Sequence, residues 1–336
     1  MYVFCVGMYR SCSTWQYNVA CRLLERHRDA RRLGPLTEEA FQEIDRRGHD
    51  TSSWLVLKCH DSNPSFAAAL AEGRALALYS FRDLRDVCYS LMHKFGQTFE
   101  QVTEPRGLLR GCVAGDAFWT AQTRTLCQQY ERLMEQPLAG VREIAAHLGV
   151  EPAEGEAESL VDEFSLPANR QRAAHFADRL RQEGHDLSDP ANALLWDPDS
   201  LLHWNHIRTG EAGSWRRLSD SSQLATLALA CGPWLIERGY ETDFSWARAG
   251  LDYLENVLHN GVPAFQRHVL LSREIRQEQA ASLESARRTM EELEARLSSY
   301  ADLGPDALGV ARAAKHFSLR FPRLARWAKR VMGRTA

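Results

Sequence analysis

Short apolar runs, bounded by turn residues or charges, recur along the first half of the chain. They occupy residues 2–6, 54–59 and 75–81, and a fourth lies near residues 126–130. Uninterrupted apolar runs of this length are typical of strands that are buried on both faces of a parallel sheet. The pattern therefore predicts four buried strands.

Helical patterns alternate with these runs. Apolar residues recur at helical spacing in residues 15–33, 87–95 and 140–148. Strand, loop and helix in succession predict βαβ units. The expected fold is therefore α/β, with a doubly wound, mostly parallel sheet.

The region after residue 150 predicts an insertion followed by closing helices. Residues 151–199 are acidic, polar and helical in patches, as expected of a lid or an acceptor-binding insertion. Residues 219–237 and 244–258 predict the closing helices. We therefore place one large α/β domain at residues 1–260.

A heptad pattern begins beyond this domain. Leu283, Met290 and Leu297 are seven residues apart, which favours a short coiled coil within residues 263–300 and a homo-oligomer formed through it. The alternative is a solvated helix with a packing stripe. Residues 301–308 then form a linker.

The final segment, residues 309–336, is basic and amphipathic. It holds eight Lys and Arg residues and no acid, interleaved with aromatic and aliphatic side chains. This composition fits peripheral docking to an anionic membrane surface. The alternative is a solvated tail or one packed on an acidic partner.

Composition narrows the function classes. With 41 basic and 44 acidic residues the formal net charge is -3, which argues against a nucleic-acid partner. Eight cysteines without a CxxC pair suit a reducing cytoplasm and give no support to a zinc site. We expect neither a secretory signal at the first residues nor a membrane-spanning helix.

The loop after the first predicted strand has the chemistry of an anion site. Its sequence, GMYRSCSTWQ, places Arg10, Ser11, Ser13 and Thr14 where backbone N–H groups and a helix N-terminus converge. A Walker loop needs Gly and Lys where Cys12 and Ser13 stand. An ordinary nucleotide triphosphatase is therefore disfavoured.

Two further strand ends carry basic residues. Period-two alternation directs Lys58 and His60 to the same side at the end of the second predicted strand. Arg82 ends the third, and Ser90 follows eight residues later in the next helix. Because the carboxyl ends of parallel strands border the ligand crevice, these residues should flank the anion loop. The alternative for Arg82 and its charged neighbours is a surface charge cluster.

A second candidate anion loop lies far downstream, in HIRTGEAGSWRR. It combines Arg208 with Gly210 and Gly213, whose missing side chains let the backbone approach a ligand closely. We interpret His203 and His206 as site-lining or structural residues, since no third metal ligand is obvious nearby.

In this order the motifs resemble the sulfotransferase family that uses 3'-phosphoadenosine 5'-phosphosulfate (PAPS), across roughly the first 240 residues. Residues 58–60 are similar to the family's Lys-Thr-His element, and Arg82 with Ser90 to its 3'-phosphate element. Residues 129–150 resemble its Tyr-Glu-Asp-Leu segment and following helix. The phosphosulfate loop of the family is matched by Arg10, Ser11, Cys12, Ser13, Thr14 and Trp15, and its late glycine loop by Arg208, Thr209, Gly210, Gly213, Ser214 and Trp215.

The resemblance implies a P-loop-like phosphosulfate loop and transfer of a sulfuryl group from PAPS to a hydroxyl or amine acceptor, without a metal. Arg10 and Lys58 would neutralise the leaving phosphate. His60 would act as the general base, the alternative being a packed histidine at a strand end.

The resemblance also implies how the rest of the donor is held. Arg82, Arg208 and Ser90 would bind the 3'-phosphate, and Trp15 would offer a face to adenine. Three residues depart from the family pattern: Arg10 and Thr209 each replace Lys, and Cys12 replaces Gly, which adds bulk to a tight loop.

Two other function classes remain open at this stage. One is a P-loop kinase or other nucleotide phosphotransferase, and the other is a membrane-associated scaffold whose sulfotransferase site has decayed. The acceptor is equally open among a sugar, a lipid and a small metabolite.

Overall fold

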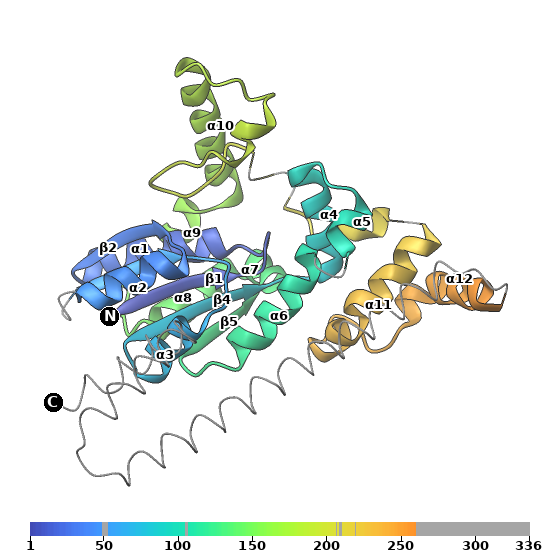
Figure 1. Ribbon diagram of the computed structural model, residues 1–336. Coiled ribbons are helices and arrows are strands. Elements are labelled where there is room, and N and C mark those ends of the chain that lie inside the picture. The colour runs from blue at the N-terminus through green and yellow to red at the C-terminus, as the bar shows by residue number, and fades with distance from the viewer. Residues whose placement is uncertain (49–52, 105–106, 206, 208–209, 219, 260–336) are drawn as a thin grey trace, which may run out of the picture. The chain divides into compact units, whose positions relative to one another are not determined.

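A five-stranded parallel sheet forms the centre of the fold, which we describe from a computed structural model (Figure 1). The structure describes residues 1–48, 53–104, 107–205, 207, 210–218 and 220–259. The predicted coiled coil, linker and basic tail therefore lie outside the described residues. The strand order is β2-β3-β1-β4-β5. This order confirms the α/β fold with a parallel sheet.

The strands lie close to the predicted positions. They are β1 (Tyr2–Gly7), β2 (Ala30–Pro35), β3 (Trp54–Lys58), β4 (Ala75–Phe81) and β5 (Thr125–Gln129). In β1, Tyr2, Phe4 and Val6 belong to one apolar cluster, while Val3 and Cys5 belong to another on the opposite face. Burial on both faces explains why the strand reads as one continuous apolar run.

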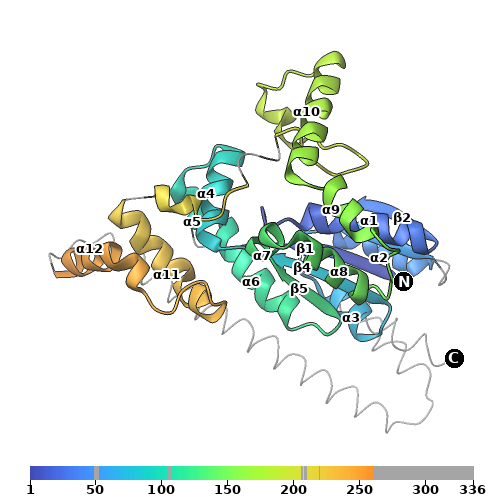
Figure 2. The same ribbon diagram turned by 180° about the vertical axis from the view of Figure 1, so that it is seen from behind.

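Helices cover both faces of the sheet, as Figure 1 and Figure 2 show from opposite sides. On one face, α1 (Ser13–His27), α8 (Pro137–His147) and α9 (Glu156–Glu163) contribute to the cluster that contains Val3. The cluster that contains Phe4 includes α2 (Glu38–Arg47), α3 (Pro64–Ala71), α4 (Leu84–Phe95), α5 (Phe99–Thr103), α6 (Leu108–Thr120) and α11 (Ser221–Glu237).

The remaining elements flank this core. They are α7 (Tyr130–Glu135), α10 (Leu166–Gln182), α12 (Arg248–His259) and the 3-10 helices η1 (Pro190–Leu194), η2 (Ser214–Arg217) and η3 (Ser245–Ala247). The predicted insertion contains α9, α10 and η1, and α10 projects away from the sheet in both views.

The prediction of one helix over residues 15–33 is wrong at its end. The helix α1 ends at His27, Arg28 is extended, and Ala30–Pro35 forms the edge strand β2 beside β3. Edge strands tolerate charge and exposure, so the sequence ARRLGP lacks the apolar run that marks the buried strands. The fourth predicted strand also ends one residue early, because Tyr130 begins α7.

A buried carboxylate joins the sheet to the closing helix. Asp116 on α6 accepts hydrogen bonds from Tyr79 Oη on β4 and from Trp234 Nε1 on α11, each at 2.9 Å. It also accepts from Nε of Arg238, at 2.9 Å. Asp116 thus accepts from three side chains that come from two separate parts of the chain.

We predict that Asp116→Ala lowers the free energy of unfolding by about 3 kcal/mol or more, because it removes the carboxylate that pairs with the Arg238 charge and the acceptor of two buried donors. Urea denaturation followed by circular dichroism measures this change. Asp178→Ala is the control, since Asp178 pairs with Arg181 at the surface with a side chain 63% exposed and should cost less than about 1 kcal/mol. Equal losses in the two variants would contradict this account.

Candidate functional site

The loop between β1 and α1 is held in a tight path by its own residues. A Cβ atom at Gly7 would lie 2.3 Å from Ser80 Oγ, so only glycine fits there. Arg10 and Cys12 both have left-handed backbone conformations, with φ of 65° and 75°. Ser11 Oγ donates to the carbonyl oxygen of Met8 at 2.7 Å and lies 2.8 Å from Ser80 Oγ. Ser11 therefore uses its hydroxyl inside the loop.

The start of α1 points a set of backbone donors out of this loop. The helix begins at Ser13, and its cap residue, Cys12, makes no side-chain hydrogen bond to it. The N–H groups of the first turn have no acceptor within a helix, and they form the positive end of its dipole. Ser13, Thr14 and Trp15 supply these groups, which suit a bound anion.

Cys12 is a neutral thiol in this loop. Burial raises the pKa of its thiol to about 12, although the cations of Arg82 and Arg10 act in the opposite direction. A thiol of this kind is a poor nucleophile near neutral pH. Cys12 therefore contributes to the shape of the loop.

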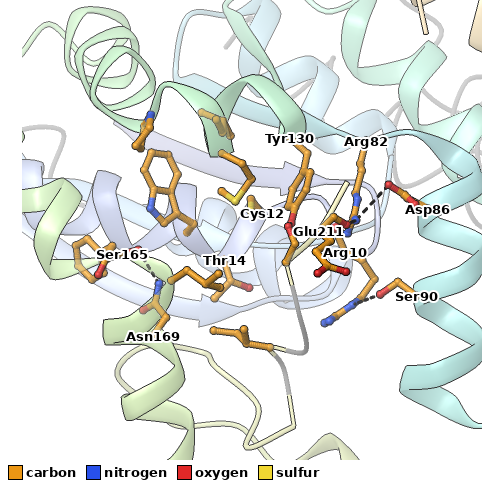
Figure 3. A pocket seen from close by; sticks show the side chains of 18 of the residues that line it. Arg10, Cys12, Thr14, Arg82, Asp86, Ser90, Tyr130, Ser165, Asn169 and Glu211 are labelled. Carbon is orange, nitrogen blue, oxygen red and sulfur yellow. Dashed lines mark hydrogen bonds and ion pairs between the residues drawn. The ribbon is translucent and has the colours of Figure 1, made fainter. Parts of the chain in front are cut away.

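One cavity of about 260 Å³ lies against this helix end and collects most of the predicted donor-site residues (Figure 3). Ser11 and Ser13 are buried beside it without lining it. Arg208 and Thr209 lie outside the described residues. The predicted residues that line the cavity are Arg10, Cys12, Thr14, Trp15, Arg82, Ser90 and Gly210.

Arg82 is held at the wall of the cavity by several contacts. It is 7% exposed, and its Nη2 donates to the carbonyl oxygen of Glu211 at 2.8 Å. Its guanidinium lies over the ring of Tyr130, 4.0 Å from the centroid. Among the described residues Arg82 Nε has no hydrogen-bond partner. A buried cation with an unused donor at a cavity wall suits a bound anion.

Arg10 and Ser90 meet at the same wall. Arg10 Nε donates to Ser90 Oγ at 3.0 Å, and the Arg10 carbonyl oxygen accepts from Arg82 Nη1 at 3.3 Å (Figure 3). The loop after β1, the end of β4 and the helix α4 are therefore linked through these three residues.

The charged residues next to Arg82 do not form a surface cluster. Arg82, Asp83, Arg85 and Asp86 are all at most 7% exposed. Asp83 caps α4 by accepting from Arg85 N at 2.9 Å. The surface alternative considered from the sequence is therefore wrong.

Asp86 connects α4 to the late glycine loop. Its carboxylate accepts from the backbone N–H of Gly213 at 2.7 Å and of Trp215 at 2.9 Å. The same carboxylate lies 3.4 Å from Arg82 Nη2. Sequence reasoning gave Asp86 no role in the site, because Arg82 precedes the helix and the partners at Gly213 and Trp215 are distant in the sequence.

Lys58 and His60 lie on the other side of the loop. Lys58 Nζ donates to His60 Nε2 at 2.9 Å, and His60 Nδ1 donates to the carbonyl oxygen of Gly7 at 2.9 Å. The imidazole stacks on the ring of Tyr9, with 4.6 Å between centroids. His60 lines a smaller cavity, of about 20 Å³, with Tyr9 and Gly7. Of the three predicted catalytic residues, Arg10 lines the larger cavity and His60 the smaller one, while Lys58 lines neither and reaches the smaller cavity through its contact with His60.

Burial controls the protonation of this pair. It lowers the pKa of His60 to about 3, and the adjacent Lys58 cation lowers it further in the same direction. Burial also lowers the pKa of Lys58 to about 8. Near pH 7 the imidazole is therefore neutral while Lys58 is still mostly protonated, which fits a Lys58 N–H donating to the lone pair of Nε2.

Tyr130 is a second cavity residue that sequence reasoning missed. Its hydroxyl donates to the carbonyl oxygen of Gly210 at 2.8 Å, beneath the stacked Arg82. The sequence pattern predicts Tyr130 at the end of a strand, whereas in the structure it begins α7. The insertion adds Phe164 and Asn169 to the far wall of the cavity.

The described residues hold neither a metal-binding cluster nor a helix suited to a membrane span. They contain no group of three or more His, Cys, Asp or Glu side chains arranged to hold a metal ion. None of the described helices is both long and apolar enough to cross a membrane.

Comparisons with known proteins agree with this architecture. Seventy-seven chains of solved structures match. Mouse sulfotransferase SULT7A1, described as complexed with PAP, matches with 14% identity and a TM-score of 0.50, over 76% of this chain and 88% of that one. Retinol dehydratase in a complex with retinol and PAP matches with 17% identity and a TM-score of 0.48, over 70% and 81%.

Sequence comparison gives the family directly. A search of curated protein sequences found no match. The family model of the sulfotransferase domain matches residues 3–237, which is most of the described part of the chain. The chain therefore belongs to the sulfotransferase family.

Proposed function

We propose that this chain transfers a sulfuryl group from PAPS to the hydroxyl or amine of a small acceptor. The observation that carries the proposal is the 260 Å³ cavity, which joins the N-terminus of α1 to the buried Arg82. A ligand with two anionic groups separated by a nucleoside fits such an arrangement. The mouse sulfotransferase of the same fold is described as complexed with PAP, the product left by PAPS, which supports this donor.

Each part of the cavity suits one part of the donor. The first-turn N–H groups of α1 and the Arg10 guanidinium would hold the 5'-phosphosulfate. Arg82, with its unused Nε, and Ser90 would hold the 3'-phosphate. Trp15 lies in the same cavity as the apolar side chains of Leu133 and Phe164, which would enclose adenine.

Lys58 and His60 would act in the transfer step itself, Lys58 on the leaving phosphate and His60 on the acceptor. In the transfer, the bond from sulfur to the leaving phosphate oxygen breaks and a bond from sulfur to the acceptor oxygen or nitrogen forms. Lys58, Arg10 and the loop N–H groups would neutralise the charge that develops on the leaving phosphate. The acceptor proton would pass to Nε2 of His60.

His60 can take this proton only if Lys58 gives up its contact. In the structure a Lys58 N–H occupies the lone pair of His60 Nε2. A phosphosulfate beside Lys58 would compete for that donor and would also raise the pKa of the imidazole. We therefore propose that donor binding frees His60 to act as the base.

Donor recognition can be tested at Arg82. The Arg82→Ala variant should bind adenosine 3',5'-bisphosphate about 2 to 5 kcal/mol more weakly, because one partner of a buried charge pair is removed. Adenosine 5'-phosphate lacks the 3'-phosphate, so its binding free energy should change far less. Isothermal titration calorimetry measures both ligands in the same variant.

Ser90→Ala provides a milder version of the same test, because the hydroxyl can be removed without leaving a buried charge unpaired. The variant should bind the bisphosphate about 1 kcal/mol more weakly, and its affinity for adenosine 5'-phosphate should not change. Equal losses for the two ligands in both variants would refute the assignment of the 3'-phosphate site.

The role of His60 as the general base can be tested by kinetics. His60→Asn should lower kcat by about 100-fold or more while the affinity for adenosine 3',5'-bisphosphate changes little, because a general base acts mainly in the transition state. Initial rates with saturating PAPS and a phenol acceptor, together with calorimetry, measure both quantities. Near-normal turnover would show that His60 only packs between Gly7 and Tyr9.

A further inference from the structure

Lys94 continues a row of functional residues along α4. Asp86, Ser90 and Lys94 are four residues apart on this helix, so they share one face. Asp86 and Ser90 line the donor cavity, whereas Lys94 does not. The row therefore leaves the donor cavity between Ser90 and Lys94.

The ammonium group of Lys94 is half-buried, and its hydrogen-bond partners among the described residues are neutral oxygens. Its Nζ donates to the carbonyl oxygen of Ala193, at 3.3 Å, and to Oδ1 of Asn205. Within the described part of the chain no carboxylate forms an ion pair with Lys94, and the same holds for Lys58. Partial burial of a cation without a counter-ion is unfavourable, which leaves the position ready for an anion.

Other basic groups gather around the same place. The imidazole of His203 is held neutral, its pKa lowered to about 4 by burial and then by the cations of Lys94, Arg10 and Lys58. Burial and the cation of Arg10 lower the pKa of Lys94 itself to about 8. These cations come from α4, from the loop after β1 and from the end of β3. Lys94 lies one helical turn beyond Ser90, whose hydroxyl accepts from Arg10 Nε at 3.0 Å. This basic group therefore borders the Arg10 end of the proposed donor site.

Apolar side chains border this basic group. Leu194 and Trp196 are 52% and 46% exposed, and Leu194 directly follows the carbonyl that Lys94 contacts. The ring of Trp196 lies edge-on to His203, with 6.1 Å between centroids. A cation with exposed apolar groups beside it suits a ligand that has both a charged group and a ring or hydrocarbon part.

We propose that Lys94 binds a carboxylate or another compact oxyanion of the acceptor, so that the preferred substrates are anionic alcohols, phenols or amines. This inference rests on the proposed sulfotransferase function. The anion would supply the counter-charge that Lys94 lacks, and it would place the reacting hydroxyl toward His60. Lys94 would therefore select the acceptor without taking part in donor binding.

A purely structural role for Lys94 makes a different prediction. By contacting Ala193 and Asn205, Lys94 also holds the end of the insertion against α4. If that contact were its only role, Asn205→Ala would have the same effect as removing the charge. Lys94→Met removes the charge but keeps a long side chain, whereas Lys94→Arg keeps the charge.

The test uses the full chain saturated with adenosine 3',5'-bisphosphate and two probes, 4-hydroxybenzoate and the neutral 4-methylphenol. Calorimetry should show that the carboxylate probe binds about tenfold more tightly, as one charge-assisted hydrogen bond allows. This preference should disappear in Lys94→Met and survive in Lys94→Arg and Asn205→Ala. The affinity for the bisphosphate should be the same in all four proteins.

Several results would overturn the proposal. They are equal binding of the two probes, absence of carboxylate binding, a preference that survives in Lys94→Met, and an equal loss in Asn205→Ala. A natural chain that does not bind the bisphosphate would instead refute the proposed sulfotransferase function. The two failures are therefore distinguishable.

Discussion

The cavity proposed to hold the donor depends on the buried carboxylate of Asp86. It accepts two backbone hydrogen bonds from the late glycine loop, at Gly213 and Trp215, and lies 3.4 Å from Arg82 Nη2. Two segments more than 120 residues apart in the sequence are thereby fixed against each other. Because Asp86 is 1% exposed, these contacts form in a medium where electrostatic interactions are strong.

The parallel sheet supplies the second constraint. Strands β1, β3 and β4 end at the same edge, with Cys5 of β1 in register with Lys58 and Gly7 in register with Ser80. Strand pairing alone therefore brings the anion loop, the Lys58–His60 pair and Arg82 to one edge of the sheet. The absence of a side chain at Gly7 then lets the loop turn over Ser80.

Much of this arrangement could be predicted from the sequence, because its motifs follow directly after strands that read as apolar runs. The predicted α/β fold is confirmed, and seven predicted donor-site residues line one cavity, although their roles in binding stay predictions. Long-range contacts could not be predicted. Neither the inward hydroxyl of Ser11 nor the partners of Asp86 and Tyr130 are encoded in local spacing. The edge strand β2 could not be predicted because its sequence, ARRLGP, is charged and lacks the apolar run that marks the buried strands.

The measurement that tests the account most directly compares ligands by thermal shift in the presence of a chelator and, separately, with Mg²⁺. We predict that adenosine 3',5'-bisphosphate stabilises the chain without metal, by about 2.7 kcal/mol at a ligand concentration one hundred times its Kd. Adenosine triphosphate should stabilise it far less, with or without Mg²⁺. Stabilisation by triphosphate only with Mg²⁺ would indicate a kinase, and stabilisation by neither ligand would indicate a scaffold. Either result would contradict the donor site proposed for this member of the sulfotransferase family.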